Sequence, residues 1–119
     1  MQKLHDLIAL MQDVQEQFRQ WHWNTREFVH LATEEVYKGL IDPLDGLAET
    51  YREMSGELYD RGEMKGTYIK EWTKEKMNQI ITGTIKDLNE TAQNYKDEGL
   101  NGYCGDCIQV LRACKYKIG

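Results

Sequence analysis

Residues 27–55 read EFVHLATEEVYKGLIDPLDGLAETYREMS and form the longest regularly patterned stretch of this chain. Apolar side chains recur there every three or four residues, which is the period of an α-helix with one buried face. They are Phe28, Leu31, Val36, Leu40, Ile41, Leu44, Leu47, Ala48, Tyr51 and Met54. At about 1.5 Å per residue the predicted helix is roughly 40 Å long. Gly56 is expected to end it.

A proline lies inside this predicted helix. Pro43 has no amide hydrogen to donate to the carbonyl oxygen of Gly39, so the sequence predicts a kink at this place. The absence of a side chain at Gly39 is expected to ease packing around the kink. Because the apolar pattern continues on both sides of Pro43, we interpret residues 27–55 as one kinked helix.

Three more helices are predicted from the same period. They cover residues 2–23, about 71–97 and about 103–117. The side chains expected to face the core are Leu4, Leu7, Ile8, Met11, Val14, Phe18 and Trp21 in the first, Trp72, Met77, Ile80, Ile81, Ile85, Leu88, Ala92 and Tyr95 in the second, and Cys104, Cys107, Ile108, Leu111 and Cys114 in the third. Four amphipathic helices with mostly short links predict an all-α four-helix bundle.

The links between the predicted helices carry turn-forming residues. Thr25 is the predicted N-cap of the helix over residues 27–55. Residues 56–70 hold three glycines and are predicted to be a connection with at most one helical turn. Gly99 and Gly102 are predicted to separate the last two helices.

Length and composition bound the domain organisation. The 119 residues are the size of one domain, so residues 1–119 are expected to form a single domain. One proline and ten glycines argue against an all-β domain, whose many turns need more of both. A chain this short has little surplus core, so association with further copies is expected.

Charge and cysteine content restrict partners and compartment. The 20 acidic and 15 basic side chains leave a net charge of −5, and no basic cluster opens the chain, which argues against DNA binding. No apolar run reaches the roughly 20 residues of a membrane span, and the first residues lack the pattern of a signal peptide. An odd number of cysteines suits a reducing compartment. We therefore expect a cytoplasmic protein without membrane contact.

The three cysteines share one predicted helix face. Cys104 and Cys107 have the spacing of a redox or zinc pair, and Cys114 adds a third thiol. A structural zinc site needs a fourth ligand, and no histidine lies near. We interpret the three cysteines as small buried residues.

Two histidines and several carboxylates form the chemically most informative group. Imidazole and carboxylate are the ligands of iron and manganese sites in helical bundles. His30 and Glu34 are four residues apart, as are Asp45 and Glu49, so each pair projects from one side of the predicted helix. The alternative interpretation is that these acidic residues only form the solvated face of the helix.

The spacing of the two pairs predicts where a site can form. Fifteen residues separate His30 from Asp45, which is about 22 Å along a straight helix. One chain therefore cannot close a single site from both pairs. Two antiparallel copies of the helix, related by a two-fold axis, place His30 and Glu34 of one chain beside Asp45 and Glu49 of the other. The spacing thus predicts a dimer with metal ions at its interface.

One part of the chain resembles a known family. The run His22-Trp23-Asn24, the histidine at position 30 and the segment LIDPLDGLAE at 40–49 resemble the mini-ferritins of the Dps type, DNA-binding proteins from starved cells. The resemblance covers residues 18–55, about a third of the chain. It implies a ferritin-like four-helix bundle.

The resemblance also implies a metal site and its ligands. His22, His30 and Glu34 would come from one chain, and Asp45 and Glu49 from its two-fold partner. The site would be a non-haem di-iron centre whose ligands also accept Mn or Zn. Fe(II) would be oxidised there by peroxide or dioxygen, for iron storage, detoxification and protection against oxidative stress. The protein would be a ferroxidase that assembles at least as a dimer, or as a hollow dodecamer.

Two alternatives stay open. Glu27 and His30 form the single Glu-x-x-His unit of the chain, and larger ferritins build their site inside one bundle from two such units. In that case Glu27 would replace Glu34. The spacing from His22 to His30 is also one helical turn shorter than is usual in the Dps family. This favours a second hypothesis, a ferritin-like bundle with a structural or interaction role, such as a phage-associated protein, that stores no iron.

Overall fold

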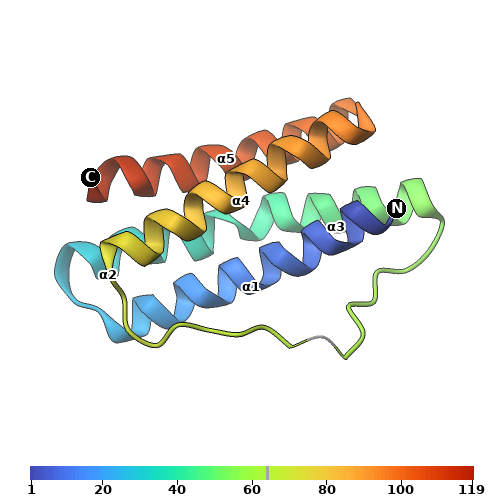
Figure 1. Ribbon diagram of the computed structural model, residues 1–119. Helices are drawn as coiled ribbons and strands as arrows, with labels where there is room; N and C mark the ends of the chain where they lie inside the picture. Colours follow the sequence, from blue (N-terminus) through green and yellow to red (C-terminus); the bar gives the residue numbers. More distant parts are fainter. Residues whose placement is uncertain (64) are drawn as a thin grey trace.

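The computed structural model describes residues 1–63 and 65–119, and Figure 1 shows its helices packed side by side. The helices are α1 Gln2–Asn24, α2 Glu27–Gly39, α3 Ile41–Ser55, α4 Lys74–Tyr95 and α5 Glu98–Ile118. Only Leu40 separates α2 from α3, so these two helices follow one kinked path and the bundle has four helical rods. The predicted all-α four-helix bundle is confirmed, and the described residues contain no β-strand.

One long connection determines how the rods run. In Figure 1, α1 and α5 run in one direction, whereas α2, α3 and α4 run in the opposite direction. The described residues of the connection, 56–63 and 65–73, therefore return along the length of the bundle before α4 begins. Within the described part of the chain, no helix is long and apolar enough to cross a membrane.

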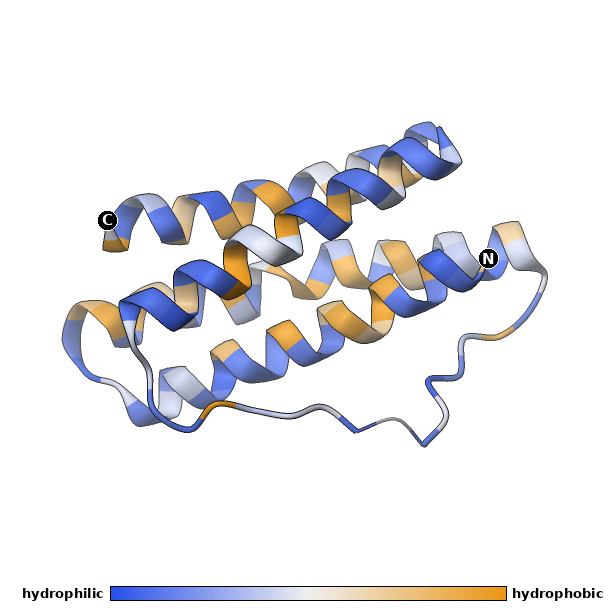
Figure 2. Ribbon diagram, viewed as in Figure 1, coloured by the Kyte–Doolittle hydropathy of each residue, from blue (hydrophilic) through white to orange (hydrophobic). Residues whose placement is uncertain are grey.

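The core lies between the four rods, where Figure 2 shows apolar residues on the inward sides of the helices. Its fully buried large side chains include Leu4, Ile8, Met11, Phe18, Trp21, Leu40, Leu47, Met77, Ile81, Leu88, Leu100 and Leu111. The three cysteines of α5 are buried as well, which confirms their predicted place on one inward face.

The predicted kink lies at Leu40, just before Pro43. The missing N–H of Pro43 leaves the Gly39 carbonyl without its helical donor, whereas the Leu40 N–H still bonds the Val36 carbonyl at 3.0 Å. A Cβ atom on Gly39 would lie 3.1 Å from Cγ1 of Val110 on α5. The prediction that Gly39 eases packing at the kink is therefore confirmed.

Part of the predicted inward stripe of residues 27–55 faces solvent instead. Phe28, Leu31, Ile41 and Met54 are 55%, 59%, 46% and 39% exposed. The stripe is wider than the arc of helix that α1 and α5 cover, so its outer members are only partly covered. The prediction that these four side chains line the core is wrong.

The last helix begins earlier than predicted. The Asp97 side chain accepts a hydrogen bond from the Leu100 N–H at 2.9 Å and so caps a helix that starts at Glu98 rather than at 103. Gly99 and Gly102 lie inside α5 and do not separate it from α4. The cap outweighs the low helix propensity of the two glycines.

One more prediction about the links needs correction. Thr25 is not an N-cap, because its hydroxyl donates to the Trp21 carbonyl at 2.6 Å and Arg26 takes the N-cap position of α2. The connection over residues 56–70 contains no helical turn in its described part, and Met64 lies outside the described residues. The remaining helix ends fall within three residues of their predicted positions.

Side chains of α1 hold the long connection in place. The Arg61 guanidinium donates to both carboxylate oxygens of Asp13 at 2.7 Å. One turn further along α1, the Gln17 amide donates to the Ile69 carbonyl at 2.9 Å and accepts from the Ile69 N–H at 2.7 Å. These contacts hold the connection along α1.

Candidate metal site

Two helix ends bring three potential metal ligands together. His22 lies in the last turn of α1, His30 in the first turn of α2, and Glu34 one turn further along α2. Only Thr25 and Arg26 link the two helices, so α2 folds back beside α1 and both histidines meet at the hairpin. His22 is 9% exposed, and His30 and Glu34 are half-buried.

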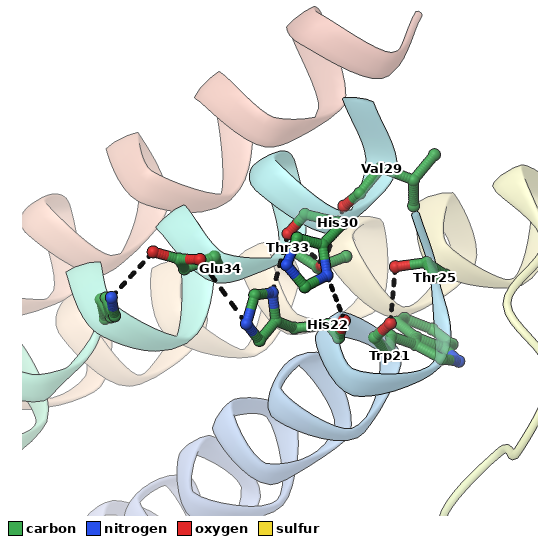
Figure 3. A network of polar contacts seen from close by, with 8 residues as sticks. Trp21, His22, Thr25, Val29, His30, Thr33 and Glu34 are labelled. Atoms are coloured by element: carbon green, nitrogen blue, oxygen red, sulfur yellow. Dashed lines mark hydrogen bonds and ion pairs between the residues drawn. The ribbon is translucent and has the colours of Figure 1, made fainter. Parts of the chain in front are cut away.

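The two imidazoles are held by a reciprocal pair of hydrogen bonds. Nδ1 of His22 lies 2.8 Å from the carbonyl oxygen of His30, and Nδ1 of His30 lies 2.6 Å from the carbonyl oxygen of His22 (Figure 3). A carbonyl oxygen can only accept, so both Nδ1 atoms carry the proton and donate. In each neutral ring the lone pair is therefore on Nε2. Metal-binding histidines commonly show this arrangement, with the second ring nitrogen bonded to a carbonyl or carboxylate.

One nitrogen of each histidine and the Glu34 carboxylate lie close together. The two rings stack with centroids 3.8 Å apart, and Nε2 of His22 lies 3.5 Å from Oε2 of Glu34. One ligand atom from each of the three residues lies within 4.8 Å of the others. Bonds of about 2.0–2.2 Å to a divalent transition metal place its ligands at most about 4.4 Å apart. The spacing of the three ligand atoms is thus close to that required by one shared ion.

A lysine completes the charge pattern of the site. Nζ of Lys38 donates to Oε1 of Glu34 at 2.7 Å, on the oxygen that does not face His22. This hydrogen bond is the main reason that the pKa of the Glu34 carboxyl is lowered. Glu34 is therefore a carboxylate at neutral pH, with an oxygen beside the imidazole nitrogens.

The other predicted ligands lie elsewhere. Asp45 and Glu49 are exposed on α3 and do not belong to the group formed by His22, His30 and Glu34. Glu27, the alternative ligand, is exposed at the start of α2 and does not belong to the group either. Across residues 1–63 and 65–119, no other histidines, cysteines or carboxylates meet in a cluster of three or more.

The cysteines are unsuited to metal binding in this state. Burial raises the pKa of Cys104 and of Cys114 to about 11 and that of Cys107 to about 12. Metals bind the thiolate form, which is scarce at neutral pH when the pKa is this high. The interpretation of these cysteines as buried packing residues agrees with their surroundings.

Three features of the site were not predicted from the sequence. Lys38 follows Glu34 at a spacing of four residues, which is the readable signal for a helical ion pair. The reciprocal bonds between His22 and His30 have no comparable signal, because they depend on the path of the short link between α1 and α2. The ring of Tyr37, 5.4 Å from that of His22, likewise reaches the site only through this packing.

Comparison with known proteins places the chain in a family. A family model described as "Family of unknown function (DUF5856)" matches residues 22–118. The chain belongs to the DUF5856 family. The part of this DUF5856 chain that matches begins at His22 and includes the whole cluster as well as Asp45 and Glu49. Comparisons with curated proteins and with solved structures gave no match.

Proposed function

We propose that this protein is a Dps-like mini-ferritin with a ferritin-like bundle, which binds Fe(II) at His22, His30 and Glu34 and oxidises it where a second copy supplies Asp45 and Glu49. The topology supports the ferritin-like part of the proposal. Bundles of that class combine short links with one long crossover, and residues 56–73 have this role here.

The reciprocal hydrogen bonds between His22 and His30 are the main observation that supports metal binding at this site. They use the Nδ1 protons of both rings, so these bonds leave both Nε2 lone pairs available. The same bonds fix the ring orientations before any ion arrives, which lowers the entropic cost of binding. Imidazole nitrogen combined with carboxylate oxygen suits Fe(II), and such a site also accepts Mn or Zn.

The outer face of α2 and α3 supports a two-fold partner. Phe28, Leu31 and Ile41 are exposed on it, although large apolar side chains gain free energy when covered. Asp45 and Glu49 are exposed on the same kinked path. Along a straight helix they would lie about 22 Å and about 28 Å from His30. An antiparallel second copy would cover the apolar residues and bring the two carboxylates to the cluster, forming two sites by symmetry.

The proposed reaction is the oxidation of Fe(II) as substrate. Two Fe(II) ions give one electron each to a peroxide, whose O–O bond breaks as two protons are taken up to form two water molecules. The chain would hold the ions through neutral nitrogens and carboxylate oxygens and leave open positions for the oxidant.

An anaerobic Fe(II) titration followed by addition of peroxide tests the proposal. We expect saturable binding, followed by a protein-dependent rise in near-ultraviolet absorbance as Fe(III) forms. His30→Ala should abolish binding, and Glu49→Gln should slow oxidation although Glu49 lies outside the cluster of its own chain. Glu90→Gln, which removes one exposed carboxylate on α4, is the matched control. Unchanged oxidation in both His30→Ala and Glu49→Gln would refute the proposal.

A second candidate follows from the three ligands within one chain. His22, His30 and Glu34 form a set that needs no partner residue to hold a single ion. Such an ion would pin α2 to α1 in a bundle that stores no iron. Metal binding that depends on His30 but leaves the protein monomeric and without oxidation activity would favour this candidate.

A further inference from the structure

Lys38 places a tethered positive charge at the metal cluster. Its Nζ lies 2.7 Å from Oε1 of Glu34, and its side chain is 58% exposed at the end of α2. The other carboxylate oxygen, Oε2, lies 3.5 Å from Nε2 of His22. Glu34 therefore faces an ammonium group on one side and a ring nitrogen on the other (Figure 3).

Glu34 does not need Lys38 in order to be ionised. A glutamate with an ordinary pKa near 4.3 is already a carboxylate at neutral pH. The ammonium group instead satisfies the carboxylate while no metal is present. Because a divalent ion at the same carboxylate would repel this ammonium, the two cations oppose each other at short range.

We infer that Lys38 competes with the metal ion for Glu34 and thereby sets the affinity of the cluster. The inference rests on the proposed function, because it presupposes that His22, His30 and Glu34 bind a metal. The long exposed side chain of Lys38 lets the ammonium move into solvent when an ion arrives. The ammonium group of Lys38 thus occupies the Glu34 carboxylate until a divalent ion displaces it. This competition disfavours monovalent ions, which bind more weakly.

A role of Lys38 in positioning Glu34 would change the metal affinity in the opposite direction. If Lys38 served to hold Glu34 in a binding position, its removal would weaken metal binding, as loss of an outer partner commonly does. If Lys38 competes, its removal strengthens binding. The direction of the change in Kd therefore separates the two roles.

The test is a titration of the full chain with Co(II), followed by calorimetry and by visible absorption. We expect Lys38→Met to lower Kd by about threefold to tenfold, from the loss of an ion pair and of like-charge repulsion. Lys38→Gln, which keeps a polar side chain, should act in the same direction. Lys38→Arg keeps the charge and should leave Kd within about twofold. Lys86→Met removes an exposed lysine from α4 and is the control for net charge.

The outcomes distinguish the inference from the proposed function. A Kd for Co(II) that is unchanged or raised in both Lys38→Met and Lys38→Gln overturns the competition by Lys38. It does not contradict metal binding by His22, His30 and Glu34. Co(II) binding that is absent, or that persists unchanged in His30→Ala, overturns the metal site and the role of Lys38 with it. Thermal unfolding of each variant, followed by circular dichroism, shows whether it folds like the parent chain.

Discussion

Gly46 is the position where the packing of this bundle can be tested most directly. It lies on α3 and faces Tyr103 of α5. A Cβ atom on Gly46 would lie 2.5 Å from Cζ of Tyr103 and closer still to Cδ1 and Cε1. Carbon atoms pack at about 3.5–4.0 Å, so Gly46→Ala forces the tyrosine ring or the helix to move.

Two opposing terms set the magnitude of the effect. Overpacking of a fitted contact costs about 1–3 kcal/mol. Replacing glycine by alanine inside a helix stabilises the folded state by about 1 kcal/mol, because alanine has the higher helix propensity. Gly46→Ala should therefore lower the free energy of unfolding by about 1 kcal/mol. Gly83 on α4 isolates the second term, because a Cβ there meets nothing within 4 Å. Gly83→Ala should raise the free energy of unfolding by about 1 kcal/mol.

Urea unfolding at 25 °C, followed by far-ultraviolet circular dichroism, measures both variants under one protocol. The two should differ by about 2 kcal/mol. In a Tyr103→Ala background the overlap is removed, so Gly46→Ala should become stabilising there, like Gly83→Ala. If Gly46→Ala and Gly83→Ala changed stability equally in the parent chain, the close approach of α3 to α5 would be refuted.

Three further predictions concern the cap, the thiols and the metal cluster. Asp97→Ala removes the cap of α5 and should lower the free energy of unfolding by about 1 kcal/mol in urea, whereas Asp106→Ala on the exposed face of α5 should change it by less than about 0.5 kcal/mol. Ellman's reagent at pH 8 should label the cysteines only in urea, since burial raises their pKa to about 11–12; fast labelling of the folded protein would contradict this. Zn(II) at 100 times its Kd should stabilise the fold by about 2.7 kcal/mol, seen as a higher Tm, and His22→Ala should remove this gain.

The helices themselves were readable from the sequence because their signals are local. The apolar period predicted the ends of α1 and of the kinked path of α2 and α3 to within one residue, and Pro43 predicted the kink. The start of α5 was missed because two glycines were weighted above the cap at Asp97. A single hydrogen bond from the Leu100 N–H decided that boundary.

The candidate site was predictable only in part. The pairs His30–Glu34 and Asp45–Glu49 follow from their spacing on one helix, and the resemblance to mini-ferritins added His22 as a ligand. The structure brings His22, His30 and Glu34 together and leaves Asp45 and Glu49 exposed on α3. No pattern in the sequence showed which members of the apolar stripe would stay uncovered, because Phe28 and Leu31 differ from buried residues only in what packs beside them.

Helical period, the proline kink and the residue types of the cluster are properties of neighbouring residues, so the sequence by itself determined them. The hairpin between α1 and α2 decided the rest. It placed each histidine ring against the carbonyl of the other and so put both lone pairs on Nε2. Hydrogen bonds between the ends of two antiparallel helices depend on their distance and rotation, and packing alone sets these.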